Sequence, residues 1–140
     1  MADSVRVLPE ILDAMLAHAR RESHIECCGL LAGRDRVITA IFAATNALAS
    51  PVAYEIAPQE LFELFRTLRT EGLQHLGQYH SHLSTENVPS PSDIEQAGYP
   101  EQAYFIVSLR QDAPKPVRAF AIRDGGVREF AIVRGAEGRS

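Results

Sequence analysis

The sequence predicts a single mixed α/β (α+β) domain, in which helices flank a mixed central β-sheet. Two segments carry apolar residues at helical spacing, and several short apolar or alternating runs are bounded by Gly, Pro, Asn and Asp. With 140 residues, 46% of them hydrophobic, the chain can bury one core and needs no second domain. We expect the domain to span residues 1–134 and residues 135–140 to form a disordered tail.

Two amphipathic helices are expected. The first runs from Pro9, a residue suited to a first helical turn, to about Arg20, and its apolar side collects Ile11, Leu12, Met15, Leu16 and Ala19. The second begins at Pro58 and ends before Gly72, and its apolar side collects Leu61, Phe62, Leu64, Phe65 and Leu68. Both helices therefore have one side to bury against a sheet.

The remaining periodic segments predict strands. Two hairpins are expected, one turning at residues 33–36 and the other at residues 124–126. Residues 54–56 are a candidate edge strand, with Glu55 on a solvated face. Between residues 83 and 100, Pro and small polar residues predict a loop followed by a short helix that begins near Ser92. The main strands are expected at residues 27–31, 37–42, 76–82, 103–109, 117–122 and 127–133.

Charge and composition exclude several functional classes. The net charge of -4 argues against a nucleic-acid partner and against binding to an anionic membrane surface. The sequence has neither a basic, apolar leader nor an apolar run long enough to span a membrane, so we expect a cytoplasmic protein. The two cysteines, Cys27 and Cys28, are adjacent, which indicates buried free thiols, with redox sensitivity near a metal as the alternative.

Three residues have the types and spacing of a metal site. His80 and His82 are two apart on a predicted strand, so both imidazoles point to the same face, although a lone His-x-His pair is weak evidence. Asp93 follows eleven residues later, after a polar loop that can fold back to the strand end. Two histidines and one carboxylate leave a fourth tetrahedral position for water, as in catalytic zinc sites, where the water's pKa falls from about 15.7 to about 7.

Hydrolysis at such a centre also needs a group that moves protons. Glu26 is the candidate, because it begins the apolar segment from Cys27 to Leu31, where an ionised side chain is costly to bury. The local pattern alone does not select it.

Together these residues resemble the JAMM motif of the JAB1/MPN/Mov34 metalloprotease family. In that motif a glutamate precedes the signature His-Ser/Thr-His, seven residues, Ser, two residues, Asp, and every spacing matches here. The segment from Glu26 to Gly33 is similar to the one that carries the family glutamate, and the closing hairpin at residues 118–133 is similar to small bacterial members. The resemblance implies a cytidine-deaminase-like MPN domain.

The resemblance also implies a role for each matching residue. His80, His82 and Asp93 would bind Zn²⁺, and Glu26 would be the general acid/base. Ser90 would stabilise the tetrahedral intermediate, although it is equally suited to cap the helix before Asp93. The residue after the second histidine is Leu83, where many bacterial relatives have proline, so we expect a changed loop stiffness and substrate groove but the same chemistry.

Three functions follow as hypotheses. The leading one, implied by the similarity to the small bacterial branch, is hydrolysis after the C-terminal glycine of a ubiquitin-like sulfur-carrier protein that ends in Gly-Gly, with release of cysteine for cysteine biosynthesis. The alternatives are an isopeptidase that removes a ubiquitin-like modifier from lysine, and a non-catalytic MPN scaffold. A homodimer is possible on this sequence. Ser81 is expected to support the sheet, Glu86 to be exposed, and His18, His24 and His75 to have surface or structural roles.

Overall fold

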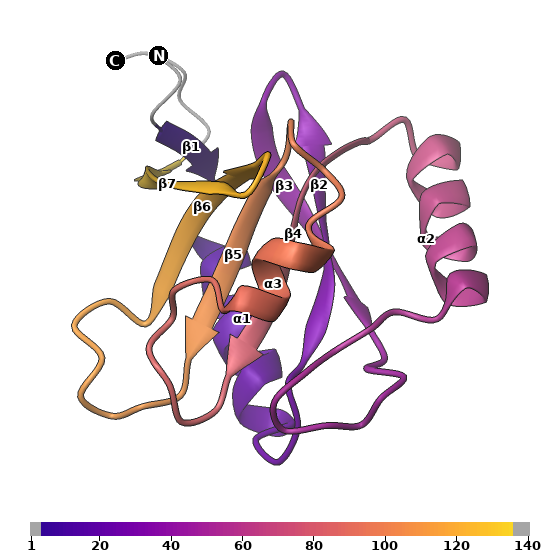
Figure 1. The fold of residues 1–140 in the computed structure, drawn as a ribbon. Coiled ribbons are helices and arrows are strands. Elements are labelled where there is room, and N and C mark those ends of the chain that lie inside the picture. The colour runs from indigo at the N-terminus through magenta and orange to yellow at the C-terminus, as the bar shows by residue number, and fades with distance from the viewer. Residues whose placement is uncertain (1–3, 136–140) are drawn as a thin grey trace.

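The computed structural model describes residues 4–135, which form three helices and seven strands (Figure 1). Residues 136–140 of the expected tail lie outside the described residues. The helices are α1 (Pro9–Arg21), α2 (Pro58–Thr70) and α3 (Pro91–Gln96). The strands are β1 (Ser4–Val7), β2 (Cys28–Arg34), β3 (Val37–Ala44), β4 (Gln74–His82), β5 (Ala103–Ser108), β6 (Val117–Arg123) and β7 (Gly126–Arg134).

Most of the expected elements are present. Both long helices begin at the prolines that predicted their first turns, and all six main strands lie where the pattern placed them. The edge strand at residues 54–56 was wrong, because these residues form part of an irregular loop, in which Glu55 is exposed. The pattern also missed β1, which has only four residues and pairs with strands far along the chain.

The sheet is mixed and closes on itself. Its strand order is β1-β3-β2-β4-β5-β6-β7, and β1 pairs in parallel with both β3 and β7. The other parallel pair joins β4 to β5 across the connection that contains α3, and the remaining neighbours are antiparallel. The end of β4, which carries the two predicted ligands, is therefore held between β2 and β5.

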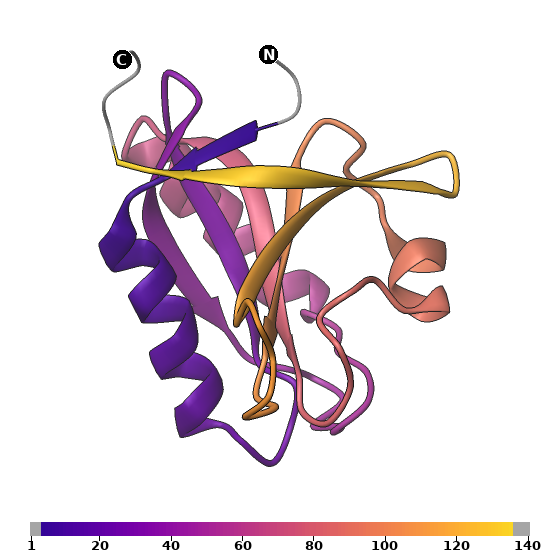
Figure 2. The same cartoon turned by 90° about the vertical axis from the view of Figure 1, so that its left-hand side faces the viewer.

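The core lies between α1 and the sheet. Met15 of α1 is buried in one apolar cluster with Tyr79 of β4 and Phe105 of β5. Figure 2 shows α1 on one side of the sheet and α3 on the other. Because side chains alternate along a strand, Tyr79 faces α1 and His80 faces the side of α3.

Ser81 has the expected supporting role. Its side chain is completely buried, and its Oγ accepts a hydrogen bond from the backbone N–H of Cys27 at 2.9 Å. The backbone N–H of Ser81 in turn donates to the carbonyl of Cys27 at 3.1 Å. These two bonds extend the contact between β2 and β4 by one residue, to the edge of the predicted site.

One glycine permits a close approach inside the sheet. A Cβ on Gly29 would lie 2.5 Å from both the carbonyl oxygen of Phe42 and Cε1 of Tyr79. Real Cβ atoms do not come so close to other atoms, so β2 tolerates no side chain at this position without displacement of its neighbours. This contact packs Tyr79, the residue before His80, against β2.

The helices also bear on the question of membrane association. Among residues 4–135, no helix is both long enough and apolar enough to cross a membrane.

Candidate metal centre

Three predicted ligands converge at the end of β4. Nε2 of His80 lies 3.2 Å from Nε2 of His82, and Oδ2 of Asp93 lies 3.1 Å from each of these nitrogens. His80 and His82 are almost completely buried. Within the described part of the chain, these three residues are the cluster of potential ligands that could hold a metal ion. Two imidazole nitrogens and one carboxylate oxygen are a donor set suited to zinc.

Contacts behind the two imidazoles fix how they face the centre. Nδ1 of His82 lies 2.7 Å from the backbone carbonyl of Glu86. A proton on Nδ1 therefore donates to this carbonyl and leaves the Nε2 lone pair free for a cation. The ring of His80 stacks on Tyr54, with ring centroids 4.5 Å apart. Tyr54 comes from the loop between β3 and α2, and the sequence analysis did not include it in the site.

Asp93 is oriented by the start of α3. Ser90 is the N-cap, since its Oγ accepts from the backbone N–H of Asp93 at 3.0 Å, while the backbone N–H of Ser90 donates to Oδ2 of Asp93 at 2.9 Å. The expected capping role of Ser90 is therefore confirmed. Burial by itself would raise the pKa of Asp93, but hydrogen bonds from His80 and His82 hold it far below its usual range. The carboxylate is thus ionised and directed at the two imidazoles.

The two imidazoles differ in their affinity for a proton. Burial lowers the pKa of His80, because its almost completely buried ring is poorly solvated. Burial also opposes the charged form of His82, but the hydrogen bonds to Asp93 and to the Glu86 carbonyl outweigh it and raise the pKa. Of the two imidazoles, His82 is therefore the one that binds a proton more readily, and such a proton competes with a metal ion.

Glu26 lies beside this cluster although it is far away in sequence. Cys28 pairs with His80, and the bonds between Cys27 and Ser81 continue the pairing, so Glu26 falls opposite His82. The side chain is 6% exposed. Burial raises the pKa of Glu26 to about 7, His82 opposes this rise, and the nearby Asp93 carboxylate adds to it. A carboxyl group with this pKa can both accept and donate a proton near neutral pH.

A buried asparagine that the sequence analysis missed fixes the backbone of Glu26. Asn46 is 3% exposed, and its Nδ2 donates to the carbonyls of Glu26 and Ala53, both at 2.9 Å. Its Oδ1 accepts from the backbone N–H groups of Leu48 at 3.0 Å and Glu55 at 3.3 Å. Asn46 thereby ties the loop that carries Tyr54 to the residue beside the centre. A single asparagine in a loop gives no sequence signal of such a role.

The two cysteines and the three other histidines lie outside the cluster. Cys27 and Cys28 are free and buried, and burial raises the pKa of their thiols to about 11 and about 12, which indicates unreactive packing residues. His18 is buried with its Nδ1 2.6 Å from the Tyr79 hydroxyl, and His75 is half-buried, with its Nε2 3.0 Å from the Gln78 side chain. His24 is exposed. Their expected surface or structural roles agree with these positions.

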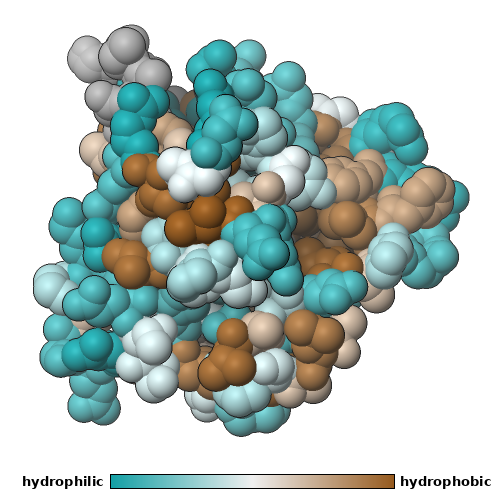
Figure 3. Space-filling view, in the orientation of Figure 1, coloured by the Kyte–Doolittle hydropathy of each residue, from teal (hydrophilic) through white to brown (hydrophobic). Residues whose placement is uncertain are grey.

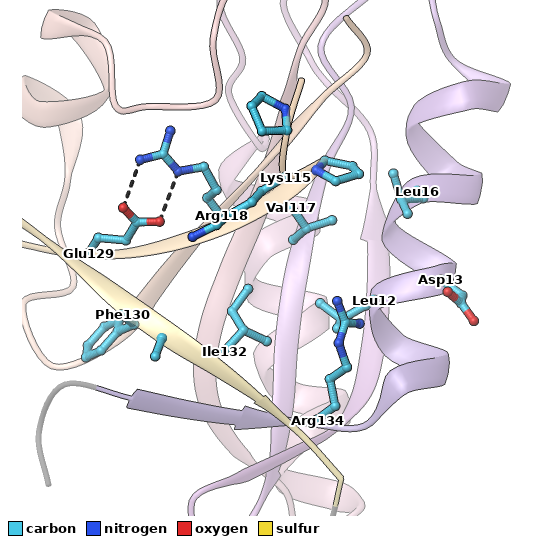
Figure 4. Close-up of a pocket in the computed structure, with 13 residues that line it drawn as sticks. Leu12, Asp13, Leu16, Lys115, Val117, Arg118, Glu129, Phe130, Ile132 and Arg134 are labelled. Atoms are coloured by element: carbon cyan, nitrogen blue, oxygen red, sulfur yellow. Dashed lines mark hydrogen bonds and ion pairs between the residues drawn. The ribbon is translucent and has the colours of Figure 1, made fainter. Parts of the chain in front are cut away.

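Two cavities differ in their relation to the centre. One, of about 480 Å³, lies beside the centre and is lined by His82, Ser90 and the loop between them. The other, of about 350 Å³, lies between α1 and the β6–β7 hairpin. Figure 4 shows the second cavity, where an ion pair joins Arg118 to Glu129 at one side. None of the five predicted site residues lines the second cavity, whereas His82 and Ser90 line the first.

Comparison with known proteins identifies the family. A family model described as prokaryotic homologs of the JAB domain matches residues 8–123. The chain belongs to this JAB family. The predicted JAMM/MPN resemblance is thus confirmed, and so is the predicted fold, which solved JAB1/MPN domains share.

Individual relatives agree with this assignment. The chain is 37% identical to a CysO-cysteine peptidase of Mycobacterium tuberculosis over 126 residues, which cover 88% of this chain and 86% of the relative. It is 36% identical to a probable TtuB-protein conjugate cleaving protease of Thermus thermophilus over 124 residues, covering 88% and 78%. A solution structure of a Desulfitobacterium hafniense protein has a TM-score of 0.84 at 33% identity and covers 95% of this chain and 94% of that one. The JAB-family chain is therefore a hydrolase.

Proposed function

We propose that this JAB-family protein is a zinc-dependent amide hydrolase that acts on the C-terminus of a ubiquitin-like sulfur-carrier protein and releases cysteine. The observation that carries the proposal is the convergence of three donor atoms, each within 3.2 Å of the others, beside a buried glutamate. Such a set, with three protein ligands and one position left for water, is typical of catalytic zinc sites.

In this proposal His80, His82 and Asp93 hold the metal. The carbonyl of Glu86 supports His82 as a ligand, because the hydrogen bond at Nδ1 selects the tautomer that directs Nε2 at the ion. The backbone N–H of Ser90 supports Asp93 as a ligand, because it donates to Oδ2 and so orients the carboxylate. Bound there, Zn²⁺ would act as a Lewis acid and would lower the pKa of its water ligand from about 15.7 to about 7.

Glu26 is the proposed general acid/base. It takes a proton from the attacking water and transfers it to the leaving nitrogen when the carbon–nitrogen bond breaks. In the metal-free protein burial raises the pKa of Glu26 to about 7, and the same burial strengthens its hold on a proton during the reaction. Asn46 is a positioning residue, since it holds the carbonyl of Glu26 at 2.9 Å.

Ser90 is the proposed stabiliser of the tetrahedral intermediate. It lines the cavity beside His82, and its Oγ, while it accepts from Asp93 N–H, still has its own proton to donate. Removal of one such donor costs about 3 to 4 kcal/mol of transition-state stabilisation in other hydrolases. The cap and the catalytic role are compatible, because they use different parts of one hydroxyl group.

The choice of substrate rests on the relatives. The M. tuberculosis relative is named as a CysO-cysteine peptidase, which supports release of cysteine as the first candidate. The sulfur carrier and its Gly-Gly end are part of the proposal. The T. thermophilus relative is named for cleavage of protein conjugates, which supports isopeptide hydrolysis at lysine as the second candidate. Both reactions break an amide bond after a terminal glycine, and they differ only in the leaving amine.

The decisive experiment offers the zinc-loaded protein two substrates built on the same carrier. One ends in Gly-Gly-Cys, and the other joins the terminal Gly-Gly to the Nε of lysine in a peptide. We expect free cysteine to be released at the higher kcat/KM, and no turnover in Glu26→Gln with zinc still bound. Faster cleavage of the lysine isopeptide would favour the second candidate, and cleavage of neither by a zinc-loaded chain would refute the proposal.

A further inference from the structure

The cavity beside His82 is lined by a guanidinium group that the proposed chemistry does not use. Of the described residues that line this cavity of about 480 Å³, Arg110 is the one with a cationic side chain and Glu86 the one with a carboxylate. Hydroxyl groups of Ser84 and Thr85 and the rings of Pro89 and Pro91 make up much of the remaining wall. The cavity wall therefore combines polar and apolar groups.

The fold fixes the backbone of Arg110 close to the centre. Ser108 is the β5 partner of His82, and the backbone N–H of Leu109 donates to the His82 carbonyl at 3.1 Å. Arg110 follows directly, and its own N–H donates to Oγ of Ser108 at 3.2 Å. Only Leu109 thus separates Arg110 from Ser108, the strand position opposite a proposed ligand.

The Arg110 guanidinium is already oriented, with one edge still available. Its Nε and Nη2 donate to the two carboxylate oxygens of Asp112 at 2.9 and 2.8 Å. This bidentate pair uses the side of the fork that contains Nε, so Nη1 and the second proton of Nη2 remain for another acceptor. A planar guanidinium held in this way suits bidentate recognition of a carboxylate.

The two parts of the proposed substrate differ in charge. The acyl part is a tail of glycines, which is narrow and uncharged. In the leaving cysteine, the α-carboxylate is bonded to the same carbon as the leaving nitrogen, so it must lie next to the centre. In a lysine isopeptide, four methylene groups separate the leaving nitrogen from the Cα, and the carboxyl group beyond it is part of a peptide bond.

We propose that the cavity beside His82 receives the leaving residue and that Arg110 binds its α-carboxylate. Arg110 is then a specificity-determining residue, which selects a single C-terminal amino acid over a lysine isopeptide. This inference rests on the proposed function, because it assumes amide hydrolysis at the centre.

The test uses two versions of one carrier protein, which differ only in the C-terminal residue. Gly-Gly is followed either by cysteine with a free carboxylate or by cysteinamide, which differs only in the lost charge. We expect the zinc-loaded wild type to prefer the acid by about 10- to 100-fold in kcat/KM, the range of a charge-assisted hydrogen bond. The preference should fall to about one in Arg110→Gln and to an intermediate value in Arg110→Lys.

Arg123→Gln is the matched control. Arg123 is also an exposed arginine with an acidic partner, Glu101 at 3.4 Å, but it does not line the cavity. This variant should keep the wild-type preference. An acid-to-amide ratio near one in the wild type, or an unchanged ratio in Arg110→Gln, would overturn the proposal.

A binding measurement separates this inference from the proposed function. Calorimetric titration of zinc-loaded Glu26→Gln with both carriers reports recognition without turnover. Tighter binding of the acid that disappears in Glu26→Gln/Arg110→Gln supports the carboxylate site, even if the wild type cleaves neither carrier and the proposed reaction is wrong. Equal dissociation constants for the two carriers refute the site, even if both are hydrolysed.

Discussion

Replacement of Glu26 by Gln in the metal-free protein removes an ionisable group from a buried position while it keeps the shape of the side chain. Burial raises the pKa of Glu26 from its ordinary value of 4.5 to about 7. The folded protein therefore binds this proton more tightly than the unfolded chain does. Below pH 4.5 both states carry the proton and ionisation has no cost, whereas above pH 7 the folded state must hold a buried carboxylate.

The size of the effect follows from these two pKa values. Each tenfold change in proton affinity corresponds to about 1.4 kcal/mol, so the difference between 4.5 and about 7 corresponds to about 3 kcal/mol. Because the folded-state pKa is raised, this penalty is absent at low pH and develops as the pH rises between these values. Glu26→Gln has no carboxyl group to ionise. Its free energy of unfolding should therefore rise relative to that of the wild type by up to about 3 kcal/mol between pH 4.5 and pH 8.

Urea unfolding at pH 5 and pH 8 measures the gap in free energy of unfolding between the wild type and Glu26→Gln. A chelator must be present, because a cation bound beside Glu26 would favour its carboxylate. Comparison of the two proteins at each pH removes the contribution of groups that they share. Glu55→Gln is the control, because Glu55 is exposed in the loop that Asn46 holds, and it shows how the same substitution at the surface changes the free energy of unfolding. If the gap between wild type and Glu26→Gln is the same at both pH values, burial does not hold a proton on Glu26 and the reasoning is wrong.

Three further changes test other parts of the structure. His80→Ala should reduce bound zinc to a small fraction of one ion per chain by elemental analysis and abolish hydrolysis, whereas the exposed His24→Ala should keep both; full zinc occupancy in His80→Ala would contradict the ligand assignment. Asn46→Ala leaves buried backbone groups without partners, so the free energy of unfolding in urea should fall by about 2 to 3 kcal/mol and kcat should fall as well. Unchanged stability would contradict the anchoring role of Asn46. Gly29→Ala should lower the free energy of unfolding by about 1 to 3 kcal/mol, because the added methyl group overpacks the sheet. Gly98→Ala is the control, since a Cβ there meets nothing within 4 Å, and equal unfolding midpoints of the two variants would refute the close contact.

Local geometry determined much of this protein from the sequence by itself. The prolines at 9 and 58 begin helices because a fixed φ and a missing N–H suit the first turn. The two-residue spacing of His80 and His82 placed both rings on one face because strand side chains alternate. These features depend only on neighbours in the chain. The spacing to Asp93 added a recognisable family motif, which named Glu26 where the local pattern did not.

The tertiary structure decided what depends on residues far apart in the chain. Pairing of β2 with β4 sets Glu26 opposite His82, and burial there moves its pKa towards neutrality. Closure of the sheet by β1, the anchoring of the Tyr54 loop by Asn46, and the approach of Arg110 to the centre likewise join distant segments. Such contacts arise when the free energy of packing and hydrogen bonding outweighs the entropy of bringing distant segments together, and no local periodicity records that balance.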